Sequence, residues 1–117
     1  MPAVADLVHQ TSASTGANDL TLAAVNGKQT FNGAFGNGVT TNVFYYHVSN
    51  RDIAGELEWG EGHMSDATTL VRDTVLGGSN GTSPVNFSAG TKDVTNDIPA
   101  ASQATTGKAI AMAIVFG

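Results

Sequence analysis

A run of β-branched and aliphatic residues at positions 68–76, followed by a wide glycine turn, constrains this chain more than any other feature. Threonine, valine and leucine in such a run favour a strand. Gly77 and Gly78 begin the turn, and a second short strand is expected from Val85. The stretch 66–94 therefore predicts a strand, a turn and a strand around which the rest of the chain is organised.

Other stretches also alternate with a period of two, which is typical of strands rather than helices. They cover residues 7–12, 20–25, 40–48, 56–64, 94–98 and 108–116. In the last stretch Ile110, Met112, Ile114 and Phe116 alternate with smaller side chains, although its alanines leave a short helix as an alternative. Turn signals recur about every ten residues. The pattern predicts an all-β fold of eight or so short strands, either a single antiparallel β-sandwich (jelly-roll-like) or a flattened barrel.

The length and composition favour one domain over residues 1–117 that is partly covered by other subunits. A chain of 117 residues with 41% hydrophobic residues is large enough for one core. Only 13% of the residues are charged, about half the usual fraction. Because so few charges protect the surface, we expect a homo-oligomer.

The charge pattern excludes several classes of partner. The net charge is −5, and the five cationic residues form no run, so nucleic-acid binding is not expected. No apolar stretch approaches the ~20 residues needed to span a bilayer, so membrane binding is not expected either. The chain has no cysteine. Its first residues lack the pattern of a signal peptide, so secretion by the general pathway is not expected.

The densest ionisable cluster contains Glu56, Glu58, Glu61, His63 and Asp66. Along a strand Glu58 lies on the face opposite Glu61 and His63, so the set does not converge on a metal. Nothing marks a cleft between Glu58 and Glu61, as a glycosidase pair would need. We interpret the cluster as a solvated strand edge or a subunit contact, and expect no enzyme, metal or cofactor.

Two further groups have structural explanations. The segment 33–38 is rich in glycine but lacks a following Lys-Ser/Thr, so we expect a loop anchored by Phe31 and Phe35 and not a nucleotide site. Tyr45, Tyr46 and Trp59 are expected mainly in the core. A sugar-stacking platform remains the alternative, and with it a carbohydrate-binding module.

The central stretch also carries a resemblance. Its most specific part is Asn86-Phe87-Ser88-Ala89-Gly90-Thr91-Lys92, preceded by Thr69-Leu70-Val71-Arg72-Asp73-Thr74-Val75-Leu76 and Ser79-Asn80. Leu20-Thr21-Leu22, Thr30-Phe31, Gly36-Asn37-Gly38 and Glu58-Trp59-Gly60-Glu61-Gly62 match earlier parts of the same pattern. Over about residues 8–100 the chain resembles a small β-rich module of tailed-bacteriophage virion proteins, found in head-fibre, decoration and tail-fibre contexts.

The resemblance implies a structural subunit without catalytic residues. It assigns a framework role to the signature residues, which are Leu70, Arg72, Val75, Leu76, Val85, Asn86, Phe87, Gly90 and Lys92. Contacts with other subunits are expected from Ile110, Met112, Ile114 and Phe116, and from Tyr46 in the strand at 40–48.

A free-standing copy of this module is expected as a capsid decoration (cement) protein or as the base of a head (vertex) spike. It would be made in the host cytoplasm and lie on the capsid surface of the virion. The expected partners are further copies in a ring, trimer or pentamer, and the major capsid protein. A tail-fibre or baseplate adaptor is the alternative within this class, and contact with a surface glycan is the alternative outside it.

Overall fold

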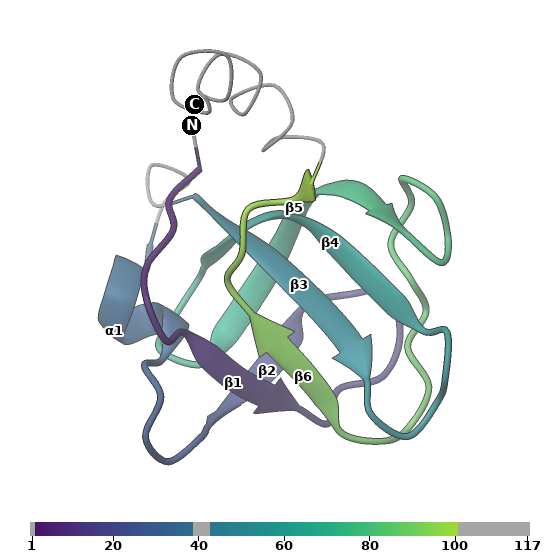
Figure 1. Ribbon diagram of the computed structural model, residues 1–117, viewed down its shortest axis with the longest axis horizontal. Coiled ribbons are helices and arrows are strands. Elements are labelled where there is room, and N and C mark those ends of the chain that lie inside the picture. Colours follow the sequence, from purple (N-terminus) through teal and green to yellow (C-terminus); the bar gives the residue numbers. More distant parts are fainter. Residues whose placement is uncertain (1, 39–42, 101–117) are drawn as a thin grey trace, which may run out of the picture.

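The fold is an all-β barrel, which confirms the predicted class. We describe it from a computed structural model, which covers residues 2–38 and 43–100. The strands are β1 (His9–Ser12), β2 (Leu20–Ala24), β3 (Phe44–Asn50), β4 (Leu57–Met64), β5 (Thr69–Gly78) and β6 (Lys92–Thr95), with one short helix, α1 (Phe31–Phe35). Six antiparallel strands close in the order β1-β2-β5-β4-β3-β6, so the structure is a barrel and not a two-layer sandwich (Figure 1).

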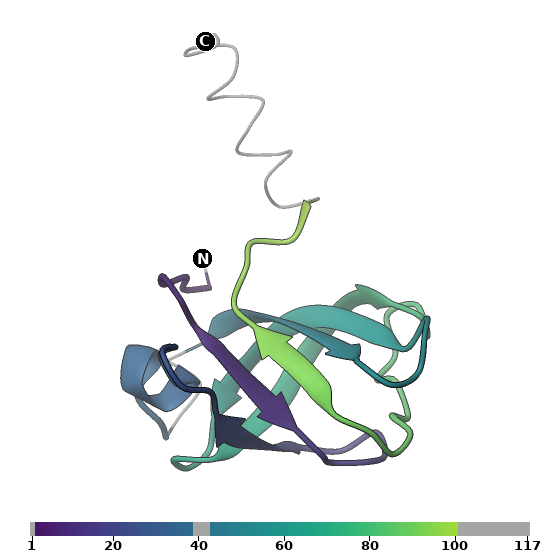
Figure 2. The ribbon, with the colours of Figure 1, turned by 60° about the horizontal axis from the view of Figure 1, so that its bottom comes forward.

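Two chain segments build the barrel, and β6 closes it. β1 and β2 form a hairpin, and β3, β4 and β5 follow one another as a meander. β6 then pairs with β3 on one side and with β1 on the other (Figure 2). Because every described strand has two neighbours, no strand among residues 2–38 and 43–100 presents a free edge along its whole length.

The core fills the barrel with side chains from β2 to β6, from the residue before β1, from α1 and from the segment at 85–87. It consists of Val8, Leu20, Leu22, Phe31, Phe44, Tyr46, Val48, Met64, Leu70, Val85, Phe87 and Val94. Gly60 and Gly62 face this core, and a Cβ at either position would collide with a β5 carbonyl and crowd the Tyr46 ring. The β4–β5 register shifts beside both glycines. Both glycines therefore mark a close approach of the β5 backbone.

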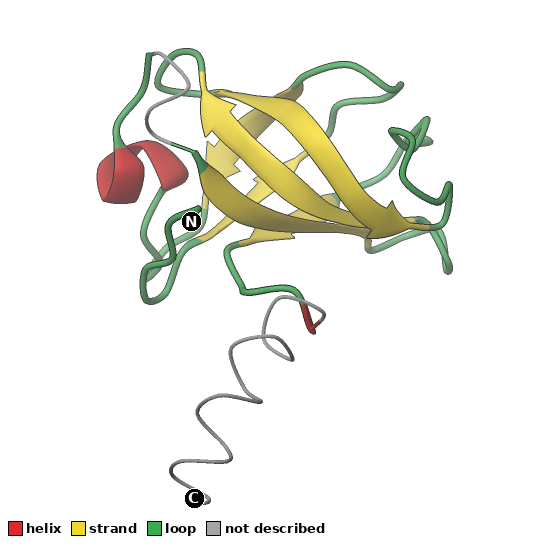
Figure 3. Ribbon diagram, turned by 90° about the horizontal axis from the view of Figure 1, so that it is seen from above, coloured by secondary structure: helices red, strands yellow, loops and turns green. Residues whose placement is uncertain are grey.

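Helix α1 was not predicted, because the sequence indicated only a loop at 33–38. Thr30 begins the helix, and its Oγ1 accepts a hydrogen bond of 2.9 Å from the Gly33 N–H. Phe31 and Phe35 pack on Phe44 with ring centroids 4.8 and 5.0 Å away, so their predicted anchoring role is confirmed. α1 therefore lies beside one end of the barrel (Figure 3).

Two further details of the strand prediction were wrong. Residues 85–87 form no strand of the barrel and pair only through a bridge between Phe87 and Gly16. Strand β6 begins at Lys92, earlier than the predicted 94–98. The expected strand at 108–116, with its contact residues, lies outside the described part of the chain. No helix in the described part is long and apolar enough to cross a membrane.

Candidate functional site

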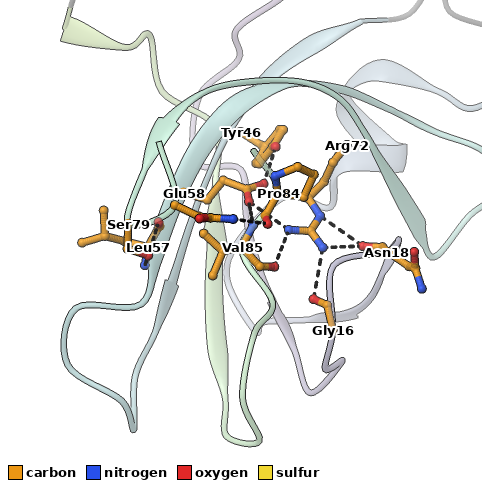
Figure 4. Close-up of polar contacts among 10 residues, drawn as sticks. Gly16, Asn18, Tyr46, Leu57, Glu58, Arg72, Ser79, Pro84 and Val85 are labelled. Carbon is orange, nitrogen blue, oxygen red and sulfur yellow. Dashed lines mark hydrogen bonds and ion pairs between the residues drawn. The ribbon is translucent and has the colours of Figure 1, made fainter. Parts of the chain in front are cut away.

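The stretch 66–94 contacts the rest of the barrel through a buried ion pair. Arg72 Nη1 donates to Glu58 Oε1 at 2.9 Å, and the two side chains are only 2% and 0% exposed. Tyr46 also donates its hydroxyl to Glu58 Oε2 at 2.6 Å, and the Val85 N–H donates to Glu58 Oε1 at 2.7 Å (Figure 4). Glu58 thus accepts three hydrogen bonds, which offset the cost of burying its charge.

Arg72 ties two separate loop segments to β5. Its guanidinium donates to the carbonyl oxygens of Gly16 at 3.2 Å, Asn18 at 2.6 Å and Val85 at 3.1 Å. The same group lies 5.5 Å from the centre of the Phe87 ring. β5 pairs with β2 only at Leu70 and Thr69. Where that ladder ends, Arg72 supplies the hydrogen bonds that a backbone neighbour would supply elsewhere.

The burial of these side chains corrects the expected places of Glu58 and Tyr46. Glu58 is fully buried and does not lie on a solvated strand edge. Tyr46 is also fully buried, so its side chain cannot contact another subunit. Burial and the hydrogen bond to Glu58 raise the pKa of the Tyr46 hydroxyl far above its ordinary value, so the hydroxyl stays a donor.

The framework role fits most of the signature but not all of it. Leu70, Val75, Val85, Phe87 and Lys92 are buried. In contrast, Leu76 and Asn86 are exposed. Leu76 is an extra residue between Val75 and Gly77, which pair with Gly60 and Trp59. Leu76 and Asn86 therefore lie on the surface and are not part of the packed framework.

The outer face of the barrel carries a row of side chains across five strands. The Cα register places His9 (β1), Thr95 (β6), His47 (β3), Trp59 (β4) and Gly77 (β5) opposite one another in turn. The rings of His47 and Trp59 are nearly parallel, at 18°, with centroids 6.3 Å apart. A side chain at Gly77 would collide with the indole, which therefore lies on the glycine backbone.

An apolar surface extends this row. Leu57, two residues before Trp59 on β4, is 39% exposed, and Leu76, next to Gly77 on β5, is 36% exposed. We call the set His47, Leu57, Trp59, Leu76 and Gly77 the Trp59 face. A shallow groove of about 330 Å³ crosses it between β4 and β6. The sequence signal for this surface was Trp59 beside Leu57 at the spacing of one strand face, but Trp59 was expected mainly in the core.

Charged groups border the groove. Asp93 accepts from Arg51 Nη2 at 2.6 Å and is 3.0 Å from His9 Nε2, and these contacts hold the pKa of its carboxyl below the ordinary value, with the Arg51 hydrogen bond the largest cause. His47 is half-buried, and burial lowers the pKa of its ring. The negative charge of Asp97 has a smaller effect that raises this pKa. The Nδ1 of His47 is buried without a hydrogen-bond partner in the described part of the chain.

The remaining members of the predicted acidic cluster disperse around the barrel. His63 contacts Asp73 at 2.7 Å on β5, and Asp66 accepts from the N–H groups of Thr68 and Thr69 in a turn. Glu56 lies just before the other end of β4, where it accepts hydrogen bonds from Asn50 Nδ2 and from the Ser88 N–H. No group of three or more metal-ligating side chains occurs within residues 2–38 and 43–100.

Comparison with known proteins adds no assignment. No family model, curated protein or solved structure matches this chain.

Proposed function

We propose that this protein is a non-enzymatic structural subunit on the surface of a tailed-phage or phage-like particle, as a decoration protein or as the base of a vertex spike. The observation that carries the proposal is the Trp59 face, where a tryptophan and two exposed leucines lie together on a barrel with few charges. Clustered apolar surface of this kind marks an interaction site. The resemblance of residues 8–100 to the phage module supports the same class.

The barrel determines how such a subunit makes contact. Because each described strand has two neighbours in the barrel, contact with other subunits would use side chains on the outer face. A second copy of this chain is the occupant that we propose for the Trp59 face, in a closed ring. Residues 101–117, with the expected contact residues, follow β6 in sequence and would supply a second surface.

Sedimentation velocity over a range of protein concentrations tests this proposal. We expect a closed oligomer that Trp59→Ala and Leu57→Ser shift to monomer by at least tenfold in dissociation constant. Val71→Ser is the matched control, because Val71 is partly buried on the outer face of β5, opposite His63 and away from Trp59. A strict monomer that also fails to enrich on particles contradicts the proposal.

A tail-fibre or baseplate adaptor would use the same surface against a different partner. Enrichment of the purified chain on isolated tails and not on heads would identify it. The described residues contain nothing that favours the tail over the head, so the capsid surface remains the proposal.

A carbohydrate-binding module is the second candidate, and the groove between His47 and Trp59 favours it. Aromatic rings beside a few polar groups, here Asp93 and Thr95, are typical of small-ligand sites. Tyr45 and Tyr46 are buried and cannot contribute to a sugar platform. Trp59 is the chain's single tryptophan, so quenching of its fluorescence by maltotriose or chitotriose, absent in glycerol, would support this candidate over a subunit contact.

A further inference from the structure

The most specific part of the signature ends in a buried lysine, Lys92. Lys92 is fully buried at the start of β6. In the register it lies directly opposite Asn50, which is also buried. Opposed residues on antiparallel strands have Cβ atoms about 4.5–5.5 Å apart, so a lysine side chain can reach its partner's carboxamide.

The Lys92 amine has few contacts. Nζ donates to the Gly90 carbonyl oxygen at 2.9 Å, and no ion pair to Lys92 occurs in the described part of the chain. Burial lowers the pKa of the amine, which favours the neutral, nucleophilic form. A Cβ at Gly90 would lie 2.8 Å from Asn50 Oδ1, so the residue whose carbonyl accepts from Nζ also lies against the Asn50 carboxamide.

The Asn50 carboxamide is held in one orientation by groups suited to acyl transfer. Its Oδ1 accepts from the Asp52 N–H at 3.0 Å, which places a donor where negative charge would develop. Its Nδ2 donates to Glu56 Oε1 at 2.9 Å, and to the carbonyl oxygens of Ser88 and Ala89 at 3.3 and 3.5 Å. The hydrogen bonds thus identify which end of the carboxamide is nitrogen.

Glu56 is positioned by the same signature segment. Its two oxygens accept from the N–H of Ser88 at 2.9 Å and from Oγ of Ser88 at 2.6 Å. These bonds, that from the Ser88 hydroxyl most, and the bond from Asn50 lower the pKa of the Glu56 carboxyl, so the group is ionised. One segment, residues 88–92, therefore supplies the lysine and orients both Glu56 and Asn50.

We propose that Lys92 and Asn50 join through an intramolecular amide bond between Nζ and Cγ, with release of ammonia. The neutral amine attacks Cγ, and Oδ1 takes the negative charge beside the Asp52 N–H. Glu56 accepts a proton from Nζ and returns it to Nδ2 as the Cγ–Nδ2 bond breaks. Amine and carboxamide give a secondary amide and one ammonia molecule, so no oxidant or other reactant is needed. The bond would link β6 to β3 covalently.

Intact mass spectrometry of the purified, denatured chain tests this directly. We expect a mass lower than that of the sequence by one ammonia molecule. Trypsin should leave Lys92 uncleaved and give a branched peptide that joins residues 29–51 to residues 73–108. Cleavage after Lys92 together with an unreduced mass overturns the proposal, whatever the oligomeric state of the protein.

Variants separate the crosslink from other losses of ammonia. Lys92→Met, Asn50→Ala and Glu56→Gln should each restore the unreduced mass, whereas Lys28→Met, at an exposed lysine, should keep the loss. Succinimide at Asn26-Gly27, Asn32-Gly33, Asn37-Gly38 or Asn80-Gly81 would also release ammonia, but it hydrolyses in mild alkali and an amide does not. A mass loss of one ammonia molecule that disappears in alkali, or that persists in Lys92→Met, contradicts the crosslink. If a variant does not fold, the branched peptide of the unaltered chain decides.

Discussion

Arg72 and Glu58 form an ion pair of 2.9 Å in the interior of the barrel, where neither side chain has appreciable contact with solvent. The pair joins β4 to β5 and, through the remaining hydrogen bonds of both groups, to residues 16–18 and 85 (Figure 4). It lies at the position where the β2–β5 ladder stops. Arg72, one of the signature residues, therefore has a structural role in joining these segments.

Removing one member of this pair should be costly. Arg72→Met leaves the Glu58 charge buried without its partner, and we expect the free energy of unfolding to fall by about 3–5 kcal/mol. Urea denaturation measures the loss. Arg51→Met is the matched control, since Arg51 forms an exposed pair with Asp93 and its loss should change the free energy of unfolding far less. Equal losses in the two variants would show that burial of the Arg72 pair is unimportant.

Asn96 fastens the N-terminal segment to the barrel, and its removal should loosen that segment. Its side chain accepts from the Ala5 N–H at 2.8 Å and donates to the carbonyl oxygens of Ala3 at 3.2 Å and Tyr45 at 2.6 Å. Asn96→Ala should cost about 1–3 kcal/mol, because it leaves buried polar groups unpaired. Hydrogen exchange should accelerate at Ala5 and not in β4. Unchanged exchange at Ala5 would refute this attachment.

Gly77 should tolerate no side chain while Trp59 keeps its place. Gly77→Ala puts a methyl group into the indole, so the ring must move or the strands must separate, at a cost of about 1–3 kcal/mol. Trp59 fluorescence should shift to longer wavelength as the ring becomes more exposed. Gly81→Ala is a useful comparison, since a Cβ there meets no atom within 4 Å although its φ is +64°. A Gly77→Ala spectrum identical to that of the unaltered chain would contradict the packing.

His47 should make the fold sensitive to mild acid. Burial lowers its pKa below the ordinary value of 6.5, so below that pH the unfolded chain binds a proton that the folded chain does not. The free energy of unfolding therefore rises with pH through this window and falls on acidification. Urea denaturation between about pH 5 and about pH 8 should show the slope, and His47→Phe should remove it. A slope that survives this substitution would have another origin.

Local patterns were enough for the class and for most of the strands. Alternation located β1, β2 and β4 within a residue or two, because the period of two follows from strand geometry whatever the partner strand. The β-branched and aliphatic content of residues 68–76 located β5. Phe31 and Phe35 were correctly placed against the core, although the short helix between them was missed.

Only the tertiary structure decided which polar residues are inside. Nothing in the neighbourhood of Glu58 distinguishes it from the exposed carboxylates around it, since its partners Arg72, Tyr46 and Val85 come from other segments. The same holds for Lys92 and Asn50, which are distant in sequence and meet because β6 enters the sheet between β1 and β3. Strand alternation assigns a side chain to a face, but the burial of a charge depends on the partners that the closed barrel brings to it.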